Sequence, residues 1–344
     1  MSVLDPSPTK DSSPTESLIS FTPTDNNDVQ ENEKQVLLDF ALSWDETKLA
    51  IYSNQGVYVY DLSTHEKIFV KTFENSDWTY QAGAITFSPD GTQIAISGKF
   101  ADEPINILDM VSQKLIATFS DIPTGYWVSE IEFNPSGKKI LARISKISCE
   151  SVKDKFVLFD INGGTDWASS DLFALDRECI IFPPIISRFT HDDKLFVFNA
   201  SPPTIIFNAN TGQNISTELS NTEQIKNYYD ISSDGKTAAI RDLHGNSTLL
   251  NIETGESLDV IQGKVLLLNN EKRFLVHDEK ENQWNFRKNG ENKCSYDGLR
   301  FTIYPGEFAL SENGNFLAAH NSPEQELQVW DISSCKIIYS LPFN

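Results

Sequence analysis

Residues 84–98 read AITFSPDGTQIAISG, in which a polar turn at Ser88–Gly91 separates two short runs of alternating apolar residues. Such alternation is typical of half-buried β-strands, and Asp-Gly favours a tight turn between antiparallel strands. The pattern recurs with an average spacing of about 45 residues, a period typical of propeller blades. The copies are FALSWDETKLAIYS, ITFSPDGTQIAIS, IEFNPSGKKILAR, SRFTHDDKLFVFN, YDISSDGKTAAIR, LLLNNEKRFLVHD and FALSENGNFLAAH.

Each hairpin is followed by two further candidate strands. The first is a β-branched or aromatic run ending in Asp or Asn, such as INILDM around Asp109, and the second is a run such as KLIATFS at 114–120. Four strands per repeat, in seven repeats, predict an all-β fold, a seven-bladed β-propeller of four-stranded antiparallel blades. We expect the ring to close, because an open array would leave long strand edges free to pair with other chains.

With these motifs, residues 36–344 resemble the WD-repeat β-propeller family. The resemblance is carried by the Ser88-Pro89-Asp90-Gly91 turn and by Trp330-Asp331, with Tyr60-Asp61 as a relaxed version of the Trp-Asp pair. The family often has a Gly-His pair that leads into a blade, and none of the five histidines occupies such a place. A generic YncE-like or TolB-like propeller is therefore the close alternative.

Residues 1–35 form a Ser/Thr/Pro-rich acidic tail, which we predict to be disordered because it has too few apolar groups to offset the entropy of ordering. Ser7, Ser13 and Thr22 each precede a proline and are candidate phosphorylation sites. The sequence leaves open whether the apolar run 18–21 adds a strand to the propeller.

The chain has 49 Asp and Glu against 28 Lys and Arg, a formal charge of −21. This charge disfavours direct binding to nucleic acid or membrane and favours a basic patch on a partner. The four cysteines show no Cys-x-x-Cys spacing, which argues against a zinc site or a disulfide framework and suits a reducing compartment. With no apparent signal peptide or membrane span, we expect a cytoplasmic or nuclear protein.

In a propeller, the loops that enter the innermost strands share one face, here called the top face, with the loops between second and third strands. Aromatic residues gather in several of these loops, and such residues are favoured as interface anchors, although they can also cap the core between blades. Cationic or titratable residues at the ends of second strands would suit an acidic or phosphorylated peptide, or they are solvated rim residues. The predicted partner-binding residues are Trp78, Tyr80, Lys99, Tyr126, Trp127, Tyr228, Arg241, His277, Tyr304 and His320.

The repeat is longest between the third and fourth copies, with extra length at 145–154 and 166–184. Long connections in compact domains are usually functional or disordered, and we expect the second to pack over the rim or to dock a partner. The acidic clusters at 191–193 and 230–234 coincide with the hairpin turns, so structure accounts for them.

No motif for nucleophilic, phosphate or zinc chemistry appears in the sequence. The positions at the channel entry are mainly aromatic or apolar, which argues against a metal site. We therefore expect no enzymatic activity, cofactor, metal or small-molecule substrate. The resemblance implies a protein-protein interaction scaffold within a multiprotein complex, with partners bound through the top face and the blade rims. The alternatives are a metal-dependent, hydrolase-like propeller enzyme and a ligand-sensing propeller of the TolB-like or YncE-like kind.

Overall fold

The structure of the chain is a computed structural model. It describes residues 35–72, 83–98, 101–147, 151–168, 173–176, 186–190, 194–198, 205–208, 213, 228–242, 244–270, 273–278, 280–281, 283–296, 299, 308–321 and 326–343. The chain divides into two units, Met1–Asn32 and Glu33–Asn344, and all the described residues belong to the second. No helix in the described part of the chain is long and apolar enough to cross a membrane.

The described residues form β-strands that pair in chain order into seven antiparallel sheets. The first three sheets contain β1 (Leu37–Leu42), β2 (Lys48–Ser53), β3 (Gly56–Asp61) and β4 (Lys67–Thr72); β5 (Ile85–Phe87), β6 (Gln93–Ile96), β7 (Ile105–Asp109) and β8 (Leu115–Phe119); and β9 (Trp127–Phe133), β10 (Lys139–Ile147), β11 (Ser151–Asp160), β12 (Gly164–Ala168) and β13 (Phe173–Asp176). The fourth and fifth contain β14 (Ile186–Phe189), β15 (Lys194–Phe198) and β16 (Ile205–Asn208); and β17 (Tyr228–Ile231), β18 (Thr237–Arg241), β19 (Asn246–Asn251) and β20 (Ser257–Gln262). The last two contain β21 (Lys264–Asn270), β22 (Arg273–Asp278), β23 (Gln283–Lys288) and β24 (Glu291–Tyr296); and β25 (Phe308–Leu310), β26 (Phe316–Asn321), β27 (Glu326–Asp331) and β28 (Lys336–Pro342).

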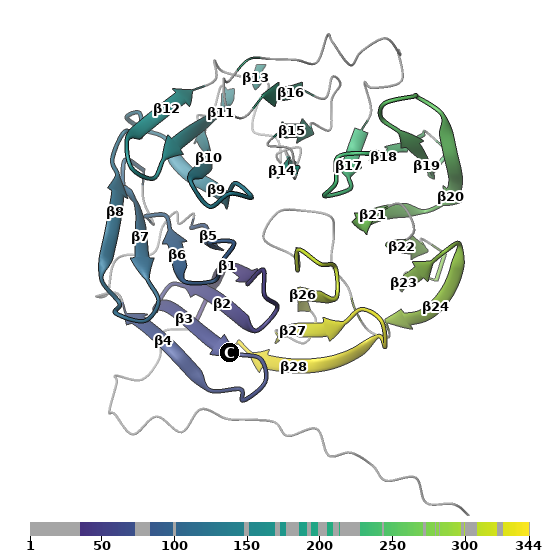
Figure 1. Cartoon of the computed structure of the whole chain (residues 1–344), viewed down its shortest axis with the longest axis horizontal. Helices are drawn as coiled ribbons and strands as arrows, with labels where there is room; N and C mark the ends of the chain where they lie inside the picture. The colour runs from purple at the N-terminus through teal and green to yellow at the C-terminus, as the bar shows by residue number, and fades with distance from the viewer. Residues whose placement is uncertain are drawn as a thin grey trace, which may run out of the picture. The chain divides into compact units, whose positions relative to one another are not determined.

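The prediction of repeated four-stranded antiparallel sheets is confirmed for six of the seven sheets, one of which has β13 as an additional fifth strand, and the sheet of β14 to β16 has three strands among the described residues. Figure 1 shows the first strand of each sheet toward the centre and the last strand toward the rim. Burial is greatest in the middle strands: β2 and β3 are mostly buried, β1 is only partly buried, and most residues of β4 and β20 are exposed. The arrangement is propeller-like.

The polar turn of the repeat is held by side chains. Ser88 Oγ donates to Asp90 Oδ1 at 2.6 Å, and the amide of Gln93 donates to Ser88 Oγ at 2.9 Å. The bond from Ser88 is the main cause of the lowered pKa of Asp90. Gly91 adopts a φ of 67°, a conformation that favours glycine. The same bonds link Ser43 to Asp45 and Ser232 to Asp234, which confirms that Asp234 of the acidic cluster 230–234 serves a turn. Asp230 of that cluster lies on β17 instead, and residues 191–193 lie outside the described residues.

Neighbouring sheets bury their faces against one another. One apolar cluster joins the sheet of β1 to β4 to that of β5 to β8, and another joins the latter to the sheet of β9 to β12. Similar clusters join the fifth sheet to the sixth and the sixth to the seventh. A further cluster joins the last sheet to the first, where Tyr339 contacts Tyr60 and His65, with ring centroids 5.9 and 5.1 Å away.

The junction between the last sheet and the first, which we call the seam, has a polar component as well. Two residues after Ser311, where other turns have Asp, this chain has Asn313. Glu46 supplies the missing carboxylate from the first sheet: it accepts from Ser311 Oγ at 2.7 Å and from Asn315 Nδ2 at 2.9 Å. β1 to β4 and β25 to β28 each come from one continuous stretch of chain, so no strand is shared across the seam.

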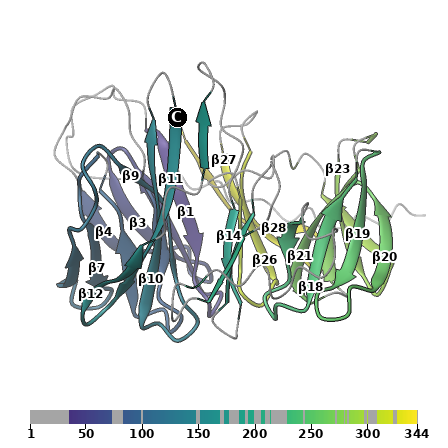
Figure 2. The ribbon, with the colours of Figure 1, turned by 90° about the horizontal axis from the view of Figure 1, so that it is seen from above.

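The extra length at 145–154 extends two strands. β10 and β11 pair from Lys139↔Asp160 up to Ile147↔Val152, well beyond the length of the other hairpins. β13, which lies within the second long connection, pairs with β11 from Ser151↔Asp176 to Asp154↔Phe173. Figure 2 shows β11 rising beyond the neighbouring sheets. The first segment was expected to be a long connection, and the structure shows that its described residues continue the pairing of the sheet.

The cysteine spacing argued against a disulfide framework, and this expectation is wrong for two of the four cysteines. Cys294 on β24 and Cys335, in the turn before β28, form a disulfide with Cα atoms 5.9 Å apart. They are 41 residues apart in sequence, close to one repeat, and this spacing places them on adjacent sheets. Cys149 and Cys179 lie outside the described residues.

Glu46→Ala tests the seam. It leaves Ser311 and Asn315 without their carboxylate acceptor, so we expect the free energy of unfolding to fall by about 1–3 kcal/mol. Urea denaturation measures the loss. The control is Glu66→Ala, which removes an exposed carboxylate of the same sheet and is expected to change stability by less than about 0.5 kcal/mol. Equal losses in both variants would contradict this role of Glu46.

Peptide mapping of the non-reduced protein is expected to recover Cys294 and Cys335 in one linked species. Because the bond closes a loop of 41 residues, Cys335→Ser is expected to lower the free energy of unfolding by about 4 kcal/mol at most. Recovery of both cysteines as free thiols, with no change in stability under reducing conditions, would contradict the assignment.

Candidate binding cavity

A cavity of about 270 Å³ lies where the innermost strands converge. β1, β5, β9, β14, β21 and β25 all line it, together with residues of the turns that follow β1, β17 and β25. All seven sheets thus contribute to one space. Trp44, Ser233 and Glu312 belong to these hairpin turns, so the cavity reaches the face opposite the predicted top face.

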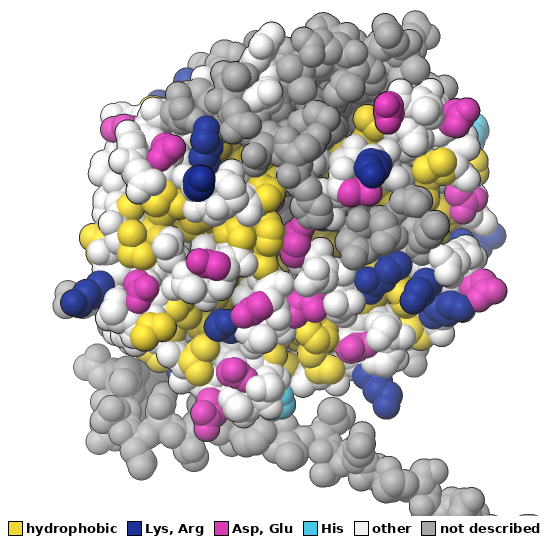
Figure 3. Space-filling model, in the orientation of Figure 1, with side chains coloured by type: hydrophobic (Ala, Val, Ile, Leu, Met, Phe, Trp, Pro, Cys, Tyr) yellow, Lys and Arg dark blue, Asp and Glu magenta, His cyan; other side chains and the backbone are white. Residues whose placement is uncertain are grey.

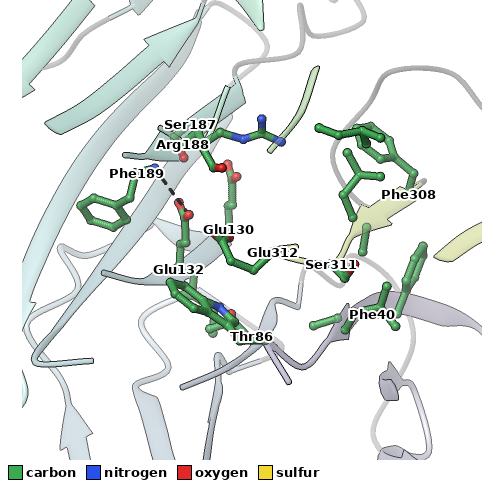
Figure 4. A pocket seen from close by; sticks show the side chains of 18 of the residues that line it. Phe40, Thr86, Glu130, Glu132, Ser187, Arg188, Phe189, Phe308, Ser311 and Glu312 are labelled. Atoms are coloured by element: carbon green, nitrogen blue, oxygen red, sulfur yellow. Dashed lines mark hydrogen bonds between the residues drawn. The ribbon is translucent and has the colours of Figure 1, made fainter. Parts of the chain in front are cut away.

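Two carboxylates enter the cavity from β9. Glu130 and Glu132 are two residues apart on one strand and therefore point to the same side. Figure 4 shows both directed toward Ser187, Arg188 and Phe189 of the next sheet. Figure 3 shows acidic side chains around the centre of the molecular face seen in Figure 1.

Glu132 is held in a protonated state at neutral pH. Burial raises its pKa to about 8, and the nearby carboxylates of Glu130 and Glu312 add to the effect, while Arg188 opposes it. Its Oε1 accepts a long bond of 3.5 Å from the amide of Phe189. Its Oε2 is inaccessible to solvent and has no hydrogen-bond partner among the described residues.

The side chain of Arg188 on β14 reaches the next sheet, where it contacts β17. Its guanidinium donates to the carbonyl of Ile231 at 2.5 Å and lies 3.3 Å from Asp230 Oδ1. Burial raises the pKa of Asp230, and Arg188 opposes the shift. The positive charge of Arg188 is therefore engaged by Asp230.

A buried carboxyl group links neighbouring sheets at three places. Asp39 accepts from the amide of Ile85 at 2.8 Å, and Asp230 accepts from the amide of Leu267 at 2.6 Å. Glu132 likewise accepts from the amide of Phe189, on the sheet that follows its own. Burial raises the pKa of Asp39 to about 7. Each group lies on an innermost strand, so the walls of the cavity are held together by acids that are costly to ionise.

The predicted partner-binding residues are only partly described. Trp78, Tyr80, Lys99 and Tyr304 lie outside the described residues, as do Ser7, Ser13 and Thr22. Tyr228 and Arg241 lie on β17 and β18, and their side chains are likewise outside the description. Their role remains a prediction.

Four of the predicted residues lie on described strands or beside them, in three different sheets. Trp127 begins β9, whereas His277 and His320 lie near the ends of β22 and β26. His277 packs against the indole of Trp284, with ring centroids 5.1 Å apart. Tyr126 is buried at 7% exposure and lies under the ammonium groups of Lys146 and Lys155, 5.7 and 5.4 Å from its ring centre. Tyr126 therefore serves packing more than exposed contact.

The sequence analysis missed Glu130, Glu132, Ser187, Arg188 and Glu312. The sequence did mark Glu132 and Arg188 as unusual. Each is a charged residue inside a short predicted strand, IEF or SRF, of a repeat. A buried charge must be paired or neutralised, so it marks a special environment. Among the described residues, no three His, Cys, Asp or Glu side chains gather closely enough to hold one metal ion.

The fold is similar to solved structures, although no protein-family model matches the chain and no curated protein matches it. A chain in the crystal structure of the mitotic checkpoint complex aligns with a TM-score of 0.57 and 14% identity, covering 92% of this chain and 99% of that one. The computationally designed protein Ika8 aligns with a TM-score of 0.54 and 13% identity, covering 90% and 88%. At these identities the likeness shows the fold alone. It supports the propeller-like arrangement of repeated antiparallel sheets.

Glu132→Gln tests the buried acid. As pH rises from about 5 to about 8, the unfolded chain ionises Glu132 while the folded chain keeps it protonated, which costs up to about 1.4 kcal/mol of stability per pH unit. Gln cannot ionise, so the variant should gain stability relative to the unmodified protein over this range. Urea denaturation at several pH values measures the difference, with the exposed Glu281→Gln as control. A difference that is constant with pH would contradict the raised pKa.

Proposed function

We propose that this chain is a closed seven-bladed β-propeller that acts as a non-catalytic protein-interaction scaffold. The observation that carries the proposal is the cavity to which all seven sheets contribute, because sheets that share one central space form a ring. Packing between the last sheet and the first supports closure as well. A ring of this kind holds its loops rigidly, and loops on a rigid scaffold commonly carry binding residues.

The face opposite the hairpin turns is the proposed interaction surface. Trp127 lies there at the start of β9, next to the long extension of β10 and β11. Lys146 lies on this extension and is exposed. Lys155 of β11 lies beside it over Tyr126. Together they provide an aromatic and cationic corner on an acidic protein, a combination that suits a partner with both apolar and acidic groups.

Charge is expected to govern association elsewhere on the surface. With a formal charge of −21, the protein attracts basic segments of partners at long range, an effect that salt weakens. Protein partners also agree with the likeness to a chain of the mitotic checkpoint complex, which is itself a protein assembly.

Affinity purification of the intact protein, followed by quantitative mass spectrometry, tests the proposed surface. We expect Trp78→Ala/Trp127→Ala to reduce capture of the main partners by about tenfold or more, because buried aromatic anchors dominate interface energies. The matched control is Trp44→Ala, which removes an indole from the opposite face. Recovery of the same partners with the double variant, and their loss with Trp44→Ala, would contradict the choice of face.

A further inference from the structure

The outer edge of β4 combines an open strand edge with exposed apolar side chains. β4 is the last strand of the first sheet and pairs only with β3 among the described strands, and Figure 1 shows it at the rim. Its outer edge therefore presents backbone N–H and C=O groups that can pair with another strand. Ile68 and Val70 on this strand are 41% and 40% exposed, although residues of these types are usually buried. Such an edge suits the addition of an extended segment from another chain.

Two lysines lie beside these apolar side chains. Lys67 and Lys71 belong to the same strand, which contains no acidic residue. The ammonium group of Lys67 lies 4.8 Å from the ring centre of Tyr58, on the neighbouring strand β3. Neither lysine forms an ion pair with a carboxylate in the described part of the chain. The strand is therefore a positively charged edge on a protein with a formal charge of −21.

Four other outer strands lack this combination. β20 has exposed Leu258 and Val260 with an aspartate between them, and β8 has exposed Leu115 and Ile116 but no charged residue. β24 carries charges of both signs, and β28 has one lysine and ends in proline, which cannot donate to a strand ladder. Lysines on an edge strand oppose pairing with a basic strand, but they favour pairing with an acidic one.

We propose that the outer edge of β4 binds an extended acidic segment of a partner protein as an additional strand. The backbone of the segment pairs with the edge, its central apolar side chains cover Ile68 and Val70, and its flanking Asp or Glu residues pair with Lys67 and Lys71. Backbone bonds provide affinity for an extended chain, whereas the side chains select the acidic one.

A peptide segment fits this edge better than an anionic membrane or a nucleic acid does. A large polyanion would be repelled by the rest of this acidic protein, whereas a short segment contacts the lysines alone. The edge belongs to the first sheet, whereas Trp127 belongs to the third. The inference thus goes beyond the surface proposed above and adds a second binding site at the rim.

Fluorescence anisotropy of the full-length protein with labelled peptides tests the proposal. Acetyl-Glu-Val-Thr-Val-Glu-amide is expected to bind about tenfold more tightly than acetyl-Lys-Val-Thr-Val-Lys-amide, because its end charges attract the lysines instead of repelling them. Two further acidic peptides are N-methylated at adjacent central residues. Successive amides of a strand point to opposite sides, so one of these peptides should lose about tenfold in affinity while the other keeps it.

Variants of the protein locate the binding site. Lys71→Glu is expected to weaken the acidic peptide about fivefold and to strengthen the lysine peptide. The matched control is Lys336→Glu, which reverses an exposed lysine on the outer strand β28 and is expected to leave binding unchanged. Val70→Ser and its control on β20, Val260→Ser, make the same comparison for apolar contact. Circular dichroism and thermal unfolding confirm that each variant is folded.

Three results would overturn the proposal. They are equal binding of the acidic and lysine peptides, equal binding of the two N-methylated peptides, and cosedimentation with phosphatidylserine vesicles that Lys71→Glu abolishes, which would assign the lysines to a membrane. If the peptides fail to bind while Trp78→Ala/Trp127→Ala still loses its partners, this inference fails and the scaffold proposal stands.

Discussion

The apolar faces of the middle strands impose the main constraint on this fold. A sheet such as β1 to β4 is apolar on both faces, because β2 and β3 are buried along nearly their whole length. A single sheet cannot shield either of its apolar faces from water, so each face packs against the neighbouring sheet. The clusters shared between consecutive sheets are the outcome, and the position of the innermost strands around a common cavity follows from them.

The innermost strands depart from this apolar rule in a systematic way. In Asp39, Glu132 and Asp230, a buried carboxyl group accepts a hydrogen bond from a backbone amide of the next sheet. A bond of this kind fixes the distance between two sheets more specifically than apolar contact does, at the cost of burying an acid. Raised pKa values at Asp39 and Glu132 are the direct result. The rigidity of the centre and its sensitivity to pH therefore have the same cause.

Much of the fold was predictable from the sequence because the repeat combines two independent signals. Alternation around the turn at Ser88–Gly91 defines the strands, and the repeat length defines their grouping. The side-chain bonds of Asp90 show why this residue type is required at that position. The pairing of Cys294 with Cys335 was not predictable from local spacing, because it depends on which sheets are adjacent. Because these two cysteines form a disulfide, the cysteine spacing no longer supports a reducing compartment.

The candidate site was harder to predict, because a pattern of alternation identifies which residues are buried but not what each one faces. Glu132 and Arg188 were recognisable as charges in buried strands, yet only the arrangement of the sheets brings Glu132 and Ser187 to one cavity. Glu46 shows the same limit. Its role depends on Ser311 and Asn315, which lie more than 260 residues away along the chain.

The continuity of each described sheet has a consequence for how the gene encodes the architecture. Because no strand of the described sheets is shared across the seam, it is equivalent in kind to the junctions within the chain. The chain ends could be moved to another connection between sheets without dividing any sheet. The chain can therefore begin at a different repeat while the same sheets remain neighbours in space. Circular permutants would preserve the same set of junctions between sheets.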